Sequence, residues 1–239
     1  MWSALAPGLD TIEAWQNWLV NPDQNLRDEQ AISLKSISPM IRRRFRTLGK
    51  YAVGSALPLL EDNEAIPSIF SSRHGDTPLS MSLLEDIGRG EPVSPTAFSL
   101  AVHNAVSGLF SIARKDTSEI TSIAPMEYIV FQTFCEALGQ LQNVEKLMCV
   151  IYDVPLPEFF SQYEDGDPFP YAIAMIISRS GNQAFELDFS ETLKEECSMT
   201  PGITGSESFS LVKLLTGLID GFSLGSMNSG WSIRKVECL

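Results

Sequence analysis

The sequence predicts an α/β fold with a parallel sheet, and three consecutive segments support that prediction. Residues 119–124 (EITSIA) have the pattern of a short strand, Pro125 opens a helix over 126–141, and 146–152 (KLMCVIY) is an apolar run. Such a run is typical of a central strand that is covered on both faces. A strand, a helix and a strand in this order predict a βαβ unit, so we expect parallel strands with helices on both sides of the sheet.

The part of the chain before this unit predicts mainly helices. Residues 11–20 carry tryptophan and leucine at helical spacing and favour an early helix. Residues 38–60 begin with Ser-Pro and predict one amphipathic helix, whose apolar face holds Ile41, Phe45, Leu48 and Ala52. Residues 65–72 predict a short buried strand, and 81–87 predict a helix. Residues 96–113 are rich in small side chains and predict a single buried helix that packs closely against another backbone.

The last third of the chain predicts a loop, two strands and a helix. Residues 155–170 are interrupted by acidic residues and prolines, so they favour a surface loop, and they lack the later ligands of a calcium-binding loop. Residues 171–178 and 184–189 predict two strands that pair with each other around a turn. Residues 208–222 predict a helix.

Composition is that of an ordinary globular protein. The 239 residues are 44% hydrophobic and 20% charged, and we expect 1–239 to form a single domain. The net charge of −13 argues against nucleic acid as a partner, because neutralising phosphates requires clustered Lys and Arg. No apolar run approaches the roughly 20 residues that span a membrane, and the first residues do not form a signal peptide. A cytoplasmic location is therefore expected.

The cysteines and histidines predict structural roles. The four cysteines lie far apart without a nearby histidine, which disfavours zinc and favours reduced, buried thiols. Cys135 falls on the flank of the predicted helix 126–141 that faces the core. His103 lies in a small, apolar segment and is expected to be buried and hydrogen-bonded. We expect no metal, no cofactor and no hydrolytic triad from three neighbours in one turn, Ser72, His74 and Asp76.

A basic cluster lies within the predicted helix 38–60 of this otherwise acidic chain, and it consists of Arg42, Arg43, Arg44, Arg46 and Lys50. Two interpretations of the cluster remain open. The simpler one is a solvated helix face with local ion pairs, and the functional one is a docking patch for an acidic carrier protein.

Three short segments resemble a known family, namely 93–98 (VSPTAF), 103–108 (HNAVSG) and 122–124 (SIA). They are similar to the stretch of β-ketoacyl synthases that leads through a buried helix, a loop and a short strand to a Thr-Ala-Cys nucleophile elbow. The match is specific over 69–153 and is closest to the short chain-length-factor-like proteins of aryl polyene clusters in Gram-negative bacteria. The resemblance implies a thiolase-like layered α/β/α fold, truncated to about one half of a β-ketoacyl synthase.

The residues that the family needs for catalysis do not match. Counting from Asn104 without gaps, the position of the nucleophilic cysteine falls on Glu127, in an elbow that we expect to be partly buried. A carboxylate is a far weaker nucleophile than a thiolate. The family also uses two histidines that follow the cysteine, whereas His74 and His103, the two histidines of this chain, both precede Glu127. The resemblance therefore implies a site without condensation chemistry.

The function implied by the resemblance is that of a non-catalytic chain length factor. It would pair with an active β-ketoacyl synthase in aryl polyene or polyketide biosynthesis, which is fatty-acid-like, and would meet an acyl carrier protein transiently. The expected partner interface is the strand Glu119, Ile120, Thr121, Ser122, Ile123 and Ala124. Two alternatives remain open, an enzyme of altered chemistry that uses Glu127 and a scaffold that binds acyl carrier proteins.

Overall fold

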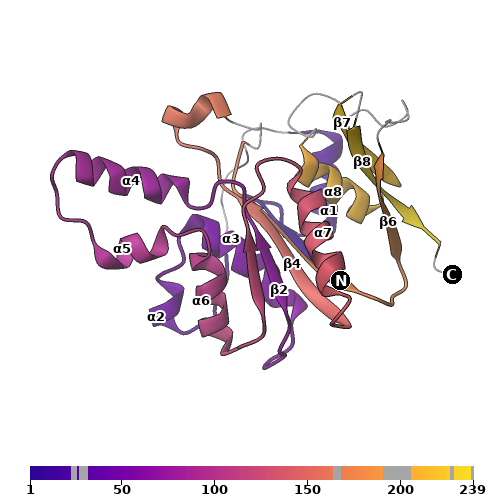
Figure 1. Cartoon of the computed structure of the whole chain (residues 1–239), viewed down its shortest axis with the longest axis horizontal. Helices are drawn as coiled ribbons and strands as arrows, with labels where there is room; N and C mark the ends of the chain where they lie inside the picture. Colours follow the sequence, from indigo (N-terminus) through magenta and orange to yellow (C-terminus); the bar gives the residue numbers. More distant parts are fainter. Residues whose placement is uncertain (23–25, 27–31, 164–167, 191–205, 227–228, 238–239) are drawn as a thin grey trace.

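A five-stranded sheet forms the centre of the molecule (Figure 1). The computed structural model describes the chain apart from residues 23–25, 27–31, 164–167, 191–205, 227–228 and 238–239. In spatial order the strands are β1 (Trp2–Leu5), β5 (Tyr171–Ser178), β4 (Lys146–Asp153), β2 (Ser68–Ser71) and β3 (Ile120–Ile123). The strands β4, β2 and β3 are parallel, while β5 runs antiparallel to both β1 and β4.

The predicted βαβ unit is confirmed, with one strand inserted between its two strands. β3, α7 (Ile129–Gln140) and β4 follow one another along the chain, and β2 lies between β3 and β4 in the sheet. Ile69 of β2 therefore pairs with Thr121 on one side and with Cys149 on the other. Since β2 is made earlier in the chain, the sequence pattern of the unit does not reveal this insertion.

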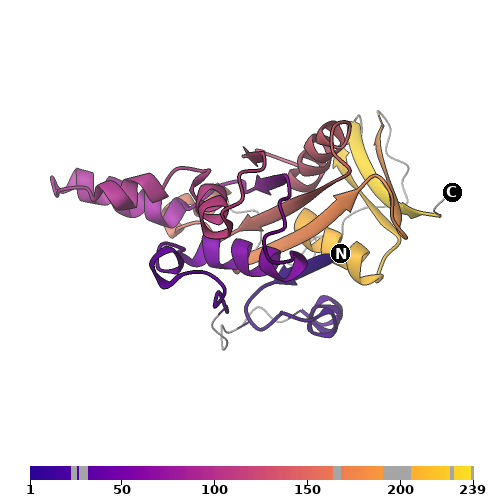
Figure 2. The ribbon, with the colours of Figure 1, turned by 90° about the horizontal axis from the view of Figure 1, so that it is seen from below.

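Two helical layers cover the sheet, as the parallel strands predict (Figure 2). One layer holds α3 (Thr47–Ala56) and α6 (Ala105–Arg114), and the other holds α7, α8 (Glu207–Thr216) and α1 (Ile12–Val20). Side chains of β4 alternate between the two resulting cores, because successive residues of a strand point to opposite faces. Leu147, Cys149 and Ile151 enter the core under α7 and α8. Met148, Val150 and Tyr152 enter the core under α3 and α6.

A helical arm extends from the side of the sheet where α6 lies (Figures 1 and 2). It consists of α4 (Thr77–Gly88) and α5 (Pro95–Leu100), which contact each other. Four apolar side chains of the arm and the turn after it are about half exposed or more, Leu84, Ile87, Phe98 and Val102. The residues 96–113 are therefore two helices, and the prediction of one buried helix is wrong. The break between α5 and α6 places His103 in a turn, where its ring contacts the carbonyl of Ser72.

The predicted helix 38–60 is also broken. It consists of α2 (Pro39–Arg42), an irregular turn, α3 and the 3-10 turn Leu57–Leu59. At the break Arg46 has extended backbone, with φ −78° and ψ −174°. The break allows Phe45 to enter the core with 3% exposure, while Arg43 and Arg44 remain in solvent. The predicted apolar face is otherwise right, because Leu48 and Ala52 are buried in α3.

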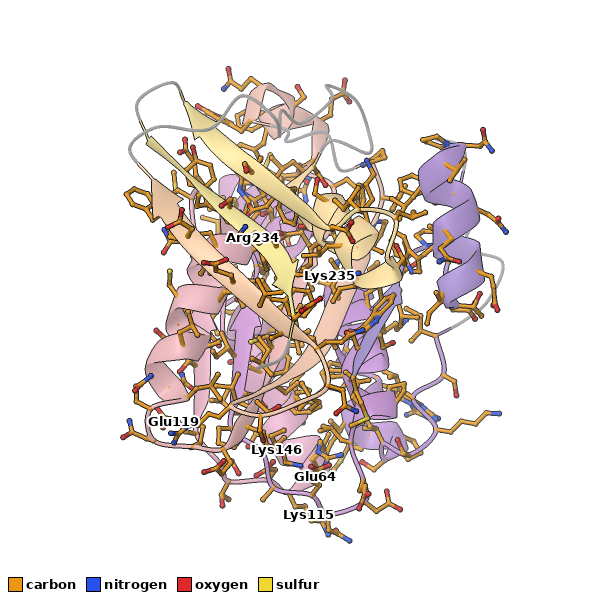
Figure 3. The ribbon with its side chains drawn as sticks, turned by 90° about the vertical axis from the view of Figure 1, so that its right-hand side faces the viewer. Glu64, Lys115, Glu119, Lys146, Arg234 and Lys235 are labelled. Carbon is orange, nitrogen blue, oxygen red and sulfur yellow. The ribbon has the colours of Figure 1, made fainter. Side chains whose placement is uncertain are left out.

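A second, three-stranded antiparallel sheet lies beside α7 and α8 (Figure 3). Its order is β6 (Ala184–Ser190), β8 (Ser229–Val236) and β7 (Gly221–Ser226). Arg234 of β8 donates to the carboxylate of Glu186 on β6 at 2.6 Å. Trp231 is buried where this sheet meets the rest of the molecule, and its ring stacks 5.2 Å from that of Phe131 on α7.

Two predictions for the last third of the chain are wrong in pairing or extent. β5 and β6 do not pair, because β1 and β4 already occupy both edges of β5. The predicted helix 208–222 ends at Thr216, where Gly217 takes a left-handed conformation (φ 80°), and β7 follows. The loop 155–170 contains the 3-10 segment Glu158–Tyr163, and its acidic residues 164–167 lie outside the described residues.

Candidate functional site

The carboxyl ends of the parallel strands β2, β3 and β4 meet at one end of the sheet. In open α/β sheets ligands and catalytic groups gather at this end, so a functional site is expected there. β2 leads into residues 72–76, β3 into the bend 124–128, and β4 ends at Asp153. Each segment contributes polar groups, and their contacts decide what the site can do.

The bend after β3 is the predicted elbow, and it carries local backbone strain. Helix α7 begins at Ile129 and not at Met126, because Tyr128 has left-handed backbone angles (φ 55°, ψ 53°). Such a conformation costs about 1–3 kcal/mol in a residue other than glycine. Glu127 lies one residue before this point and is exposed, so the expected partial burial of its side chain is wrong.

A carboxylate from the far end of the chain closes the start of α7. Glu207 Oε1 accepts hydrogen bonds from the backbone N–H groups of Val130 at 2.9 Å and Phe131 at 3.0 Å. Burial raises the pKa of Glu207 to about 7, against the lowering effect of these hydrogen bonds. The free N–H groups that give a helix N-terminus its affinity for anions are therefore occupied by the chain itself. The sequence gives no signal for this contact, since Glu207 lies 77 positions after Val130.

A second buried carboxylate fixes the segment after β2. Asp153 accepts hydrogen bonds from Ser72 Oγ at 2.7 Å, from Arg73 N at 3.1 Å and from His74 N at 3.4 Å. Burial raises the pKa of Asp153 to about 6, although these three contacts favour the carboxylate. The nearby guanidinium of Arg73 lowers the pKa of both Asp153 and Glu207. These groups tie β2, β4, α7 and α8 together at the end of the sheet.

The contacts of Ser72, Asp76 and His103 hold the segment after β2 in place. Ser72 donates to Asp153, and Asp76 accepts from Leu79 N at 3.0 Å as the cap of α4, so both side chains have partners outside the group Ser72, His74 and Asp76. His103 Nε2 lies 2.7 Å from the carbonyl oxygen of Ser72, so the expected hydrogen bond is confirmed, whereas the expected burial is only partial. Desolvation lowers the pKa of His74, so its ring is neutral at physiological pH.

The described cysteines are not activated thiols. Cys149 is fully buried in β4, and burial raises its pKa above the physiological range. Cys135 is exposed on α7, so the expectation that it faces the core is wrong, and partial burial raises its pKa too. A raised pKa leaves a thiol protonated and a poor nucleophile. Cys197 and Cys238 lie outside the residues that the structure describes.

The predicted interface strand forms an edge of the sheet. Ser68 N and Ser72 N of β2 donate to the carbonyls of Glu119 and Ile123, so the backbone groups of the alternate residues of β3 point to the other side. Within the described part of the chain, that side of β3 pairs with no strand. A free strand edge is a template for pairing with another chain. The polar groups of Ile120 and Ser122 are therefore available to a partner.

A groove of about 740 Å³ runs beside this edge, between α6 and β3. Ser107, Gly108 and Ser111 line it from α6, and Ile120 and Ser122 line it from β3. The Oγ atoms of Ser107 and Ser122 lie 2.8 Å apart and connect its two walls. Thr121 and Ile123 point to the opposite face, where the Thr121 hydroxyl accepts a hydrogen bond from Gln140 of α7.

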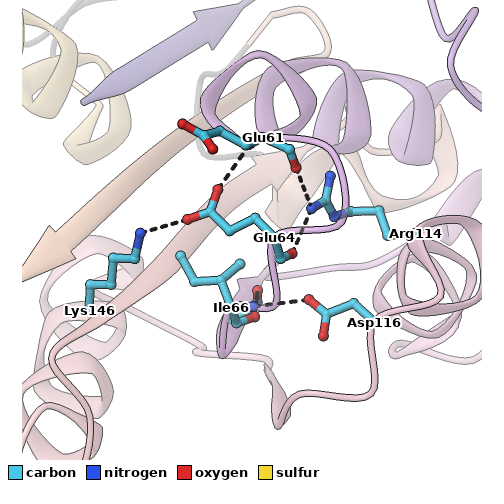
Figure 4. A network of polar contacts seen from close by, with 7 residues as sticks. Glu61, Glu64, Ile66, Arg114, Asp116 and Lys146 are labelled. Carbon is cyan, nitrogen blue, oxygen red and sulfur yellow. Dashed lines mark hydrogen bonds and ion pairs between the residues drawn. The ribbon is translucent and has the colours of Figure 1, made fainter.

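A polar network fixes the end of α6 and hence the shape of the groove (Figure 4). Arg114, the last residue of α6, donates to the carbonyls of Glu61 at 3.1 Å and Glu64 at 2.7 Å. The ammonium of Lys146 lies 2.6 Å from the Glu64 carboxylate and lowers its pKa. Asp116 accepts from Ile66 N at 3.0 Å and holds the connection between α6 and β3 against the sheet.

The basic cluster lies around the break between α2 and α3, and does not form one helix face. Arg43, Arg44, Arg46 and Lys50 are exposed, while Arg42 is partly buried. The guanidinium of Arg46 pairs with the carboxylate of Asp76 at 3.3 Å. Because the Arg46 side chain is half exposed, solvent screens this pair and it contributes little to stability.

Among the described residues, no three His, Cys, Asp or Glu side chains gather to hold a metal ion. Across that part of the chain, no helix has the length and apolar character that crossing a membrane requires.

Comparison with known proteins gives a family and several similar folds. The family model described as the N-terminal domain of β-ketoacyl synthases matches residues 15–230. No curated protein matches the chain. A ketosynthase (ApeO) in complex with its chain length factor (ApeC) from Xenorhabdus doucetiae is similar in structure, with 22% identity and a TM-score of 0.81. That match covers 98% of this chain and 97% of the other chain.

Two further solved structures share the fold at lower identity. The ishigamide ketosynthase/chain length factor has 11% identity and a TM-score of 0.64, with 82% of this chain and 67% of that chain covered. A type II PKS acyl-carrier protein in complex with its ketosynthase (AntDE:AntF) has 10% identity and a TM-score of 0.63, with 99% and 98% covered. These likenesses confirm the predicted ketosynthase-like α/β fold.

Proposed function

Because the chain belongs to the β-ketoacyl synthase family, we propose that it is a non-catalytic chain length factor that pairs with an active ketosynthase. The observation that carries the proposal is the elbow after β3. It holds the exposed Glu127 where the resemblance places the nucleophilic cysteine, and Glu207 occupies the helix start behind it. No histidine follows position 103 to stabilise an enolate. A site built in this way has neither nucleophile nor oxyanion support.

The partner surface that we propose is the edge strand, residues 119–124. Its outward backbone groups and the groove beside it suit a second chain of the same fold, which continues the sheet. The similar solved structures include a ketosynthase with its chain length factor, which supports this choice of partner. In the pair, side chains of this subunit limit the space for the growing acyl chain and so set its length by volume exclusion. The product class that we propose is an aryl polyene or a related polyketide.

The proposal extends to the carrier protein and to the location. We propose that the exposed arginines near the α2–α3 break contact an acidic acyl carrier protein transiently. Arg43 and Arg44 support this proposal because both are exposed and, among the described residues, neither forms an ion pair. We place the protein in the cytoplasm, together with the ketosynthase and the carrier protein. Residues 1–239 act as one domain in this proposal, since β1 pairs with β5 and α1 packs on α8.

Co-expression with a β-ketoacyl synthase from the same genome tests the proposal. The two chains are expected to co-purify as a complex that extends malonyl units on a carrier protein. The isolated chain is expected to release neither condensation product nor carbon dioxide from malonyl-carrier protein. Turnover by the isolated chain would favour the alternative enzyme that uses Glu127. Binding of the carrier protein without binding of the ketosynthase would favour the scaffold.

Replacing Glu127 with cysteine tests whether the elbow lacks only its thiol. We expect Glu127→Cys to be alkylated by iodoacetamide because position 127 is exposed, but to give no condensation product. At pH 8, where a carboxyl group with a pKa of about 7 is mostly ionised, Glu207 offsets the positive end of α7, so the new thiol should react at the rate of an ordinary exposed cysteine. Mass spectrometry of the peptide that contains position 127 measures the alkylation.

The matched control for this variant removes the competing charge. Adding Glu207→Gln to Glu127→Cys should accelerate alkylation at position 127, because the helix dipole then acts without an opposing carboxylate. Condensation product from either variant would contradict the assignment of a site that also lacks its histidines.

A further inference from the structure

Gly108 occupies a helical position where nothing in the described chain requires a glycine. It is the fourth residue of α6, is exposed, and lies in the groove between α6 and β3. A Cβ atom built at this position meets no atom of the described residues within 4 Å. Glycine in a helix interior costs about 1 kcal/mol relative to alanine. The isolated chain therefore carries a destabilising residue that its own packing does not explain.

Other glycines in the described helices have a structural reason within the chain. In α3, a Cβ at Gly49 would lie 2.8 Å from the Phe45 ring, and a Cβ at Gly54 would lie 2.4 Å from Ile32. Close packing within the chain requires both. Gly88 and Gly139 also have open surroundings, but they lie in the last two residues of α4 and α7, where a helix frays and a glycine costs less. Within the described helices, Gly108 is thus the interior glycine whose reason lies outside the chain.

The residues around Gly108 form a surface of small side chains whose hydroxyl groups are already hydrogen-bonded. Ser107 Oγ contacts the Asn104 carbonyl at 3.0 Å and Ser122 Oγ at 2.8 Å. Ser111 Oγ donates to the carbonyl of Asp116 at 2.6 Å. Because these hydroxyls already have partners, a helix backbone can pack on them without leaving a polar group unsatisfied. The network at Arg114 and Asp116 holds this surface in place before any partner arrives.

The geometry of the sheet edge indicates which element of a partner would lie in the groove between α6 and β3. If a strand of the partner continues the sheet antiparallel to β3, the local two-fold axis runs perpendicular to the sheet, as in a symmetric dimer. Elements on the α6 face of this chain then meet elements on the same face of the partner. The two strands lie about 4.8 Å apart, while helices with ordinary side chains pack 8–10 Å apart. A side chain at position 108 would stand in the space that the approaching helix needs.

We infer that the groove receives the ketosynthase helix that corresponds to α6, and that Gly108 is the contact that lets its backbone approach. This inference rests on the proposed pairing with a ketosynthase. It assigns to Gly108 a role in specificity, because the groove fits only a partner whose helix packs this closely against α6. A second copy of this chain is the competing occupant, and the same variants separate the two.

Two substitutions at Gly108 test the inference against the affinity of the complex. Gly108→Ala is expected to raise the melting temperature of the isolated chain by roughly 2–4 °C, because helix propensity improves and no atom is displaced. The same variant should bind the ketosynthase about tenfold more weakly, and Gly108→Leu more than 100-fold more weakly, because the interface becomes overpacked. Circular dichroism gives the melting temperature, and titration calorimetry gives the affinity.

The control places a leucine on an exposed helix at the other edge of the sheet. Asn17 is exposed on α1. This helix lies next to β1, the edge strand opposite β3, because the indole N–H of Trp15 donates to the carbonyl of Ala4. Asn17→Leu should leave the affinity unchanged. Wild-type affinity in Gly108→Leu would overturn the inference and leave the proposed function intact. Failure of the wild-type chain to bind the ketosynthase would overturn both. Loss of self-association in Gly108→Leu, with ketosynthase binding retained, would assign the groove to a second copy and overturn the inference.

Discussion

Proline at position 122 is expected to weaken binding of the ketosynthase roughly 100-fold while the chain itself remains folded. Ser122 lies in the edge strand β3 with its backbone N–H directed away from β2. Proline is tolerated on an edge strand where the N–H faces solvent, so Ser122→Pro keeps the ladder between β2 and β3. It removes one cross-edge hydrogen bond and places its ring against the partner strand, which costs about 3 kcal/mol or roughly 100-fold in affinity.

Alanine at the same position separates the backbone from the side chain. Ser122→Ala retains the N–H and loses the 2.8 Å contact with Ser107, which contributes about 1 kcal/mol to stability. We expect both variants to melt within a few degrees of each other and Ser122→Ala to bind the ketosynthase as the wild type does. Equal affinities for the proline and alanine variants would show that the partner docks away from β3.

The free energy of unfolding is expected to fall as the pH rises from 4.5 to 8, and Glu207 accounts for a large part of the decrease. Its pKa is about 7 in the folded chain and near 4.5 in the unfolded chain. The folded state therefore holds the proton more tightly, so the stabilisation is complete below pH 4.5 and is lost as the pH rises through 7. A shift of this size corresponds to about 3 kcal/mol. Urea unfolding at several pH values measures it.

Glutamine at position 207 removes this titration and keeps an oxygen that accepts from Val130 and Phe131. Glu207→Gln should show a shallower decline of stability with pH than the wild type. The remaining decline belongs to Asp153, whose pKa burial raises to about 6 and which also loses its stabilising proton as the pH rises. An unchanged pH profile in Glu207→Gln would mean that Glu207 is ionised throughout and that Arg73 and the hydrogen bonds outweigh its burial.

The sequence predicted the elements that depend on local pattern or on continuous burial. The apolar run of β4 was placed correctly, because a strand covered on both faces has no polar residue to interrupt it. Helix α1 begins where Thr11 accepts a hydrogen bond from Ala14 N at 3.1 Å, a cap encoded within one turn. The position of β3 at an edge next to the elbow agrees with the expected interface strand, although its role remains a prediction.

The features that the sequence did not predict depend on distant contacts. Helix breaks at Arg46 and His103 arise because Phe45 enters the core and the His103 ring reaches Ser72, neither of which alters helical periodicity. The sequences of β7 and β8 do not have a clear strand pattern. These strands are stabilised by pairing, since β8 pairs with both β6 and β7. Glu207 resembles any acidic residue in a first helical turn until α8 packs against α7.

The pairing of the first strand with β5 constrains how the chain folds during synthesis. Trp2 pairs with Met175, and Gln16 of α1 donates to the carbonyl of Thr216 at 3.0 Å. Neither contact can form until those later residues have left the ribosome, which takes roughly 10–40 s at 5–20 residues per second. During that interval the apolar rings of Trp15 and Trp18, which later pack on Phe209, have no partner in the core. We therefore expect the nascent chain to expose these two tryptophans for most of its synthesis, and exposed apolar surface of this kind favours aggregation.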